Sequence, residues 1–172
     1  MLLDVDDFEL FGLPRRFALD GAELDARRRR LQAEVHPDRF AAADAASRRR
    51  AMQQAVRVNE GYERLRDPLR RAAYLCELNG APIRAEDNTA MPEDFLVQQM
   101  AWRDALEEAR GAAELHSVAA ELDAYRADAY ERLAATLDER RDFASAAAQV
   151  RALMFVERFA DDVDERKAAE ER

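Results

Sequence analysis

Residues 20–40, DGAELDARRRRLQAEVHPDRF, predict a helix that ends in a short polar loop. Asp20 has the character of a helix N-cap, and Glu23 follows three residues later, as in a capping box. Pro37 disfavours helical geometry at the residue before it, so His36 is expected to leave the helix. The helix therefore runs from about residue 21 to residue 35, with apolar side chains at helical spacing: Leu24, Leu31 and Val35.

A second long helix is predicted on the other side of this loop. Residues 44–66 place apolar side chains at helical intervals, namely Met52, Ala55, Val58, Tyr62 and Leu65. Asp67-Pro68 ends this helix, because proline fits the first turn of a further helix over residues 68–78. An apolar cluster over residues 8–19 suits a short helix followed by extended chain. The two long helices joined by the polar loop predict an antiparallel hairpin.

The second half of the chain predicts long helices packed as a bundle. All five prolines lie before residue 93, and Gly111 is the only glycine after it. Amphipathic patterns extend over residues 93–110, 113–140 and 142–166. The short connections between them make neighbouring helices antiparallel. Because β-branched residues are also scarce, the predicted fold class is all-α, with a C-terminal three-helix bundle.

Charge divides the chain in the same way as the prolines. The sequence carries 27 basic and 36 acidic residues, a net charge of −9. Residues 11–71 hold 15 arginines against nine acids, whereas residues 81–172 hold 12 basic residues against 22 acids. Turn-forming residues cluster between these stretches. We therefore predict a first domain over residues 1–79, a linker over residues 80–92 and the bundle over residues 93–172.

Several function classes are excluded by composition. A single cysteine, Cys76, cannot form an internal disulfide, a cysteine-rich zinc site or an iron–sulfur ligand set. The two histidines, His36 and His116, fall in no metal-ligand spacing, so we expect neither a metal site nor a cofactor. Residues 1–7 are acidic where a targeting segment would be basic, and no apolar run is long enough to span a membrane. We expect a soluble cytoplasmic protein without membrane attachment.

The tripeptide His36-Pro37-Asp38 is open to several interpretations from its residues alone. A histidine two residues from an aspartate is the pattern of a general base and its orienting carboxylate. No serine or cysteine nucleophile and no phosphate-binding glycine loop accompanies it, so no catalytic residue is assigned. A simpler interpretation is a turn stiffened by proline, in which the aspartate caps a helix or pairs with an arginine. Nucleic-acid binding through the arginine clusters 27–30 and 48–50 is disfavoured, because aromatic residues are not interleaved and the whole chain is acidic.

The first bundle helix has more apolar surface than one core stripe needs. Leu96, Val97 and Met100 fall beside the stripe that contains Phe95 and Trp102. Phe155, on the last helix, similarly lies outside the apolar stripe that contains Val150 and Met154. Two interpretations remain open: the helix is apolar over a wide arc, or these side chains form an exposed patch for a partner.

The surroundings of the tripeptide resemble a J-domain. A basic helix precedes it, Arg39-Phe40 follows it, and residues 59–74, NEGYERLRDPLRRAAY, end the hairpin. This resemblance, over about residues 6–79, implies that the loop engages a DnaK-type ATP-dependent chaperone and stimulates its ATP hydrolysis. The residues that it implies for chaperone binding are His36, Pro37, Asp38, Arg27, Arg28, Arg29 and Arg30.

Over the whole chain the sequence resembles the HscB family, the J-protein co-chaperones of iron–sulfur cluster assembly. Four stretches carry this resemblance in order: residues 8–14 (FELFGLP), 36–40 (HPDRF), 73–80 (AYLCELNG) and 95–100 (FLVQQM). The resemblance implies a non-enzymatic co-chaperone whose bundle binds an IscU-like scaffold protein and delivers it to an HscA-type chaperone. The residues that it implies for scaffold binding are Leu96, Val97, Met100, Arg103, Asp104, Glu108 and Phe155.

Overall fold

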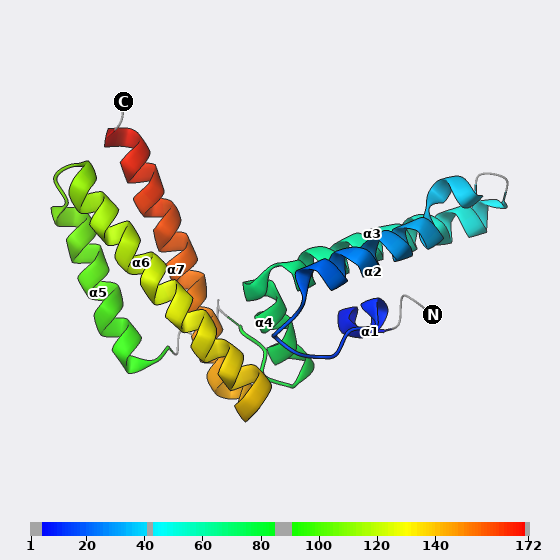
Figure 1. Ribbon diagram of the computed structural model, residues 1–172, viewed down its shortest axis with the longest axis horizontal. Helices are drawn as coiled ribbons and strands as arrows, with labels where there is room; N and C mark the ends of the chain where they lie inside the picture. The colour runs from blue at the N-terminus through cyan, green and yellow to red at the C-terminus, as the bar shows by residue number, and fades with distance from the viewer. Residues whose placement is uncertain (1–4, 41–42, 85–90, 171–172) are drawn as a thin grey trace. The chain divides into compact units, whose positions relative to one another are not determined.

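The computed structural model describes residues 5–40, 43–84 and 91–170 (Figure 1). These residues form helices and turns without a β-strand, so the all-α prediction is confirmed. The chain divides into two compact units, Met1–Leu75 and Cys76–Arg172. Part of the predicted linker, residues 85–90, lies outside the described residues. In the described part of the chain, no helix is both long enough and apolar enough to cross a membrane.

The first unit is built on an antiparallel helical hairpin, as predicted. It contains α1 (Asp7–Phe11), α2 (Gly21–Val35) and α3 (Ala45–Arg66), and α4 (Pro68–Leu78) begins in it. α2 and α3 lie side by side along their lengths (Figure 1). The Asp20 carboxylate accepts hydrogen bonds from the backbone N–H groups of Ala22 and Glu23, at 2.8 and 3.3 Å. The predicted N-cap of α2 is thus confirmed.

The buried face of α3 differs in register from the predicted one. Val58, Tyr62 and Leu65 are buried as expected, but Met52 is 61% exposed and Ala51 takes its place in the core. The reason is that residues 51, 58, 62 and 65 follow the i, i+7, i+11, i+14 line that faces α2. Met52 is one position further round the helix.

A buried carboxylate joins α1 to α3. Asp7 is fully buried, forms an ion pair with Arg57, and accepts a hydrogen bond of 2.7 Å from Arg64. α1 can approach this closely because residue 61 is glycine: a Cβ there would lie 3.2 Å from both Asp7 Oδ1 and Phe11 Cε2. A glycine inside a helix costs backbone entropy, and here it allows the two helices to meet.

The second unit contains the predicted three-helix bundle. It consists of α5 (Glu93–Glu108), α6 (Ala112–Ala134) and α7 (Phe143–Glu170), connected by short loops. The helix predicted over residues 113–140 is not α-helical throughout, because Ala135–Arg140 form a π-helical segment. Arg141 then takes a left-handed conformation with φ 54°, and this reverses the chain before α7.

The bundle core is rich in aromatic residues from all three helices. Phe95 and Trp102 of α5 pack with Val118 and Leu122 of α6 and with Val156 and Phe159 of α7. The Trp102 and Phe159 rings stack with centroids 6.4 Å apart. Since such rings bury large areas, this cluster dominates the packing of the bundle.

The chain segment before the bundle is fastened to α7. Arg151 of α7 is buried, and its Nη1 donates a hydrogen bond of 3.0 Å to the carbonyl oxygen of Ile83. Ile83 is itself buried. A buried guanidinium requires such partners, so this contact holds residue 83 against the unit to which it belongs.

Candidate protein-interaction sites

The predicted loop follows directly after α2 and presents the His36 and Asp38 side chains to solvent. His36 is the C-cap of α2, and Pro37–Phe40 form one turn of 3-10 helix. The His36 and Asp38 side chains are 57% and 89% exposed, and His36 Nδ1 lies 3.6 Å from Asp38 Oδ2. The Asp38 backbone N–H also donates to His36 Nδ1 at 3.3 Å. The loop is therefore locally ordered, while its carboxylate is free to meet a partner.

Arg39 holds the loop against the helix that it follows. Its Nη1 donates hydrogen bonds to the carbonyl oxygens of Ala33 and Glu34, at 3.1 and 3.4 Å. A cation at a helix C-terminus satisfies free carbonyl groups and interacts favourably with the helix dipole. Sequence reasoning did not assign this role, although an arginine shortly after a helix end is a signal for it.

The four consecutive arginines of α2 do not share one environment. Arg27 pairs with Glu23 at 2.9 Å and donates to the Phe11 carbonyl oxygen at 3.4 Å. The Arg28 guanidinium lies over the Tyr62 ring, 4.0 Å from its centroid. These two side chains are partly buried within the first unit.

Arg29 and Arg30 are exposed and form no ion pair with another described residue. They are the two members of the cluster whose charge is fully available to a partner.

The structure decides between the two interpretations of the apolar surface on α5. Leu96, Val97 and Met100 are 46, 71 and 66% exposed, so they form a patch and not a wide core face. They lie close together because they are separated by one, three and four positions on one helix. Exposed apolar side chains grouped in this way are typical of a surface that a partner covers.

Phe155 of α7 extends this patch across to a second helix. Its ring packs edge-on against Phe95, with centroids 5.7 Å apart, and the Arg103 guanidinium lies 5.4 Å from its centroid. Asp104 and Glu108 are exposed on α5. The structure thus brings together Arg103 and Phe155, two residues of the predicted set. We call this set, Leu96, Val97, Met100, Arg103, Asp104, Glu108 and Phe155, the apolar patch with its charged rim.

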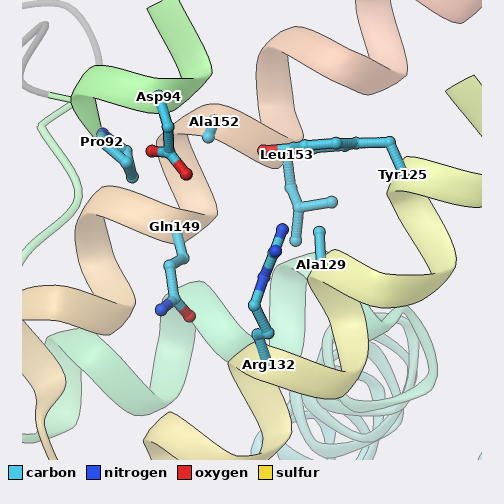
Figure 2. A pocket seen from close by; sticks show the side chains of 8 residues that line it. All are labelled: Pro92, Asp94, Tyr125, Ala129, Arg132, Gln149, Ala152 and Leu153. Carbon is cyan, nitrogen blue, oxygen red and sulfur yellow. The ribbon is translucent and has the colours of Figure 1, made fainter. Parts of the chain in front are cut away.

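A separate pocket of about 180 Å³ lies among α5, α6 and α7 (Figure 2). Two of its polar groups are engaged within the bundle: Arg132 pairs with Asp128 at 2.7 Å, and Gln149 Nε2 donates to Thr136 Oγ1 at 3.2 Å. The Gln149 side-chain oxygen is buried without a hydrogen-bond partner among the described residues. Burial raises the pKa of Tyr125, which lines the same pocket. The pocket is large enough for water molecules, and we assign no ligand to it.

The described residues contain no group of three or more metal-ligating side chains of the His, Cys, Asp or Glu type. Cys76 is buried, and burial raises its pKa to about 11. A thiol in this environment is protonated at neutral pH and is a poor nucleophile and metal ligand.

Comparison with known proteins agrees with this architecture. Residues 91–164 match the family model described as the HSCB C-terminal oligomerisation domain. The co-chaperone protein HscB homolog of Bordetella petrii is 52% identical over 162 residues, covering 92% of this chain and 94% of the relative. The chain belongs to the HscB co-chaperone family. The HscB homolog of Burkholderia multivorans is 53% identical over 159 residues, covering 91% of this chain and 90% of the relative.

Solved HscB structures share the fold. Chaperone HscB from Vibrio cholerae has a TM-score of 0.80 at 34% identity, covering 96% of this chain and 99% of that chain. Human co-chaperone protein HscB has a TM-score of 0.87 at 26% identity, covering 95% of this chain and 83% of that one. The predicted arrangement of a J-domain followed by a helical bundle is that of the HscB family.

Proposed function

We propose that this HscB chain binds an IscU-type scaffold protein through its bundle and presents it to an HscA- or DnaK-type chaperone through its J-domain. The chain stimulates the ATPase of that chaperone and so assists iron–sulfur cluster maturation or transfer. In this role it supplies binding surfaces and no catalytic group, and the partner hydrolyses ATP. Residues 1–79 form the J-domain and residues 93–172 the scaffold-binding bundle.

The exposed Asp38 carboxylate is the observation that carries the chaperone half of the proposal. A loop that orders its backbone and leaves a carboxylate 89% exposed is preorganised for a partner and loses little entropy on binding. Arg29 and Arg30 lie on the helix that leads into this loop and add exposed positive charge. Such charges steer a transient encounter with an acidic surface. The remaining members of the proposed chaperone-binding set are His36, Pro37, Arg27 and Arg28. Arg27 and Arg28 also contact α1 and α3 through the Phe11 carbonyl oxygen and the Tyr62 ring.

The apolar patch with its charged rim supports the scaffold half. Three apolar side chains that are about half exposed or more would be costly to leave in water without a partner. Their charged rim resembles that of a transient protein interface, in which an apolar centre is surrounded by polar groups. The J-domain and the patch lie in different units of one chain, so each partner has a binding surface of its own.

A chaperone ATPase assay tests the proposal. The full chain, the purified chaperone and the purified scaffold are combined singly and together, and phosphate release is measured. We expect stimulation by the chain alone and more than additive stimulation when the scaffold is present. Asp38→Asn should reduce the rate to the basal value without changing scaffold binding. Glu34→Gln is the matched control, because it removes one exposed negative charge at the end of the same helix.

Two results would contradict the proposal in different ways. Full stimulation by the Asp38→Asn variant would remove the loop from the mechanism. Stimulation without any response to the scaffold would mean that the chain delivers a different client.

A further inference from the structure

A hollow of about 570 Å³ lies beside Phe155, between α5 and α7. Phe155 and Phe159 stack with ring centroids 5.8 Å apart, and together with Leu106 they give the hollow an apolar floor. Phe159 belongs to the bundle core, so this floor is part of the rigid packing of the bundle. The hollow is therefore a preformed surface and does not require the bundle to open.

Four charged side chains line the same hollow: Arg103 and Glu107 from α5, and Arg158 and Asp162 from α7. None of the four forms an ion pair with another described residue. Arg103 lies over the Phe155 ring, and Arg158 donates its Nε–H to the Met154 carbonyl oxygen at 3.2 Å. Their charges are thus left for a group outside the chain.

The charges are separated along the hollow. α5 and α7 run in the same direction (Figure 1), and the Arg103 guanidinium reaches the Phe155 ring. Along the helix axes Arg158 is about 4.5 Å beyond Phe155, Glu107 about 6 Å beyond Arg103, and Asp162 about 10 Å beyond Phe155. The positive end therefore adjoins Phe155, and the negative end lies further along both helices.

The hollow continues the apolar patch without a break. Leu96, Met100, Arg103 and Glu107 follow one another at i, i+4, i+7 and i+11, which is a single stripe along α5. Arg103 and Phe155 belong both to the patch and to the hollow. A partner segment that covers the patch and follows this stripe enters the hollow next.

We propose that the scaffold protein occupies this hollow as well as the patch. The segment that enters the hollow carries charges complementary to those of the hollow, in the same order along the helices. The segment places an apolar side chain on Phe155, a carboxylate at Arg103 and Arg158, and a basic side chain at Glu107 and Asp162. The inference rests on the proposed scaffold binding and deepens it. It makes Arg158 and Asp162 specificity-determining residues. It also adds Glu107 to the interface, next to Glu108 of the predicted set.

Two charge reversals of opposite sign test this inference. The dissociation constant of the full chain for the purified IscU-type scaffold of the same organism is measured by titration calorimetry. We expect Arg158→Glu and Asp162→Lys each to raise it by about fivefold to tenfold, because each places like charges together. The first makes the chain more negative and the second more positive, so a loss in both cannot come from net charge.

Arg166→Glu is the matched control. Arg166 is exposed on α7 about 12 Å beyond Arg158, outside the hollow. It should leave the dissociation constant within about twofold of the unaltered chain, because Arg166 lies one turn beyond Asp162 and lines no part of the hollow. Far-UV circular dichroism of each variant confirms that the bundle is folded. The double variant Leu96→Ala with Met100→Ala tests the patch separately.

The outcomes distinguish the two proposals. If the Leu96/Met100 variant loses binding and the hollow variants do not, scaffold binding stands and the inference about the hollow is overturned. If one reversal weakens binding and the other strengthens it, or if Arg166→Glu weakens it equally, the effect is net charge and the inference is overturned. If the unaltered chain does not bind the scaffold, the proposed function fails and the inference with it.

Discussion

Replacing Asp7 by asparagine should destabilise the J-domain strongly although the shape of the side chain is retained. Asp7 is fully buried between α1 and α3, where it meets Arg57 and Arg64. Its backbone N–H donates to the Tyr74 hydroxyl at 3.1 Å, and that bond remains in the variant. The substitution therefore removes the charge and leaves two guanidinium groups without their carboxylate.

The size of the effect follows from the burial of the two arginines. The Arg57 side chain is only 19% exposed, so the loss of its charged partner costs about 1.5–3 kcal/mol. The Arg64 side chain is 41% exposed and is better solvated without Asp7, so its contribution is about 1 kcal/mol or less. We expect the variant to lose about 2–4 kcal/mol of unfolding free energy.

Urea unfolding of the full chain can assign this loss to the correct unit. The chain has one tryptophan, Trp102, which is buried in the bundle core, so its fluorescence reports the second unit. Far-UV circular dichroism reports helices in both units. Hydrogen exchange of peptides from α1 and α3 locates the destabilisation directly. Glu9→Gln is the matched control, because it removes an exposed negative charge from α1.

We expect faster exchange in α1 and α3 in Asp7→Asn and little change in Glu9→Gln. A change in unfolding free energy below about 0.5 kcal/mol, the usual range for surface substitutions, would refute the reasoning. So would an equal loss in Glu9→Gln, because burial of the carboxylate would then not be the cause.

Two further predictions concern titratable groups. Hydrogen bonds from the Ser145 hydroxyl and backbone N–H lower the pKa of Asp142, the residue before α7, below its ordinary value of 3.8. Asp142 thus caps the N-terminus of α7. Because its pKa is lower in the folded chain than in the unfolded chain, its carboxylate stabilises the fold above pH 3.8. This stabilisation is lost as the pH falls through the folded pKa. In thermal unfolding followed by circular dichroism, Asp142→Asn should lose less stability on acidification than the unaltered chain, and an equal loss would contradict the assignment. Burial raises the pKa of Cys76 to about 11, so the folded chain should react with a disulfide reagent at pH 8 only after denaturant is added. Rapid reaction of the folded chain would show that the thiol is accessible.

Local chemistry was sufficient to predict the helices. Asp20 caps α2 as expected, and Pro37 ends it at the expected residue. The π-helical segment after α6 was missed, because its residues have the same apolar spacing as an α-helix. The exposed position of Met52 was missed for a related reason: two neighbouring stripes of α3 are both partly apolar, and only the packing of α2 selects one.

The sequence placed the polar loop at the end of α2 and left open whether the extra apolar side chains of α5 are exposed. The loop at His36 and the apolar side chains Leu96, Val97 and Met100 are found on the surface. The sequence shows four equivalent arginines before the loop, whereas the structure engages Arg27 and Arg28 inside the J-domain. Glu23 lies one turn before Arg27 on α2, a spacing that the sequence shows. The Phe11 carbonyl oxygen that Arg27 meets and the Tyr62 ring under Arg28 lie on other elements, and no local pattern predicts those contacts.

The sequence by itself determined the all-α class, the hairpin with its polar loop, the bundle and the division of charge, because these depend on caps, prolines and periodicity within one segment. Only the tertiary structure decided that Asp7 is buried against α3, that Arg151 holds Ile83, and that Arg103 meets Phe155. These pairs lie 50 or more residues apart, and their contacts arise from how whole helices pack together. The physical reason is that periodicity assigns a side chain to a face, while its partner is chosen by the packing of another element.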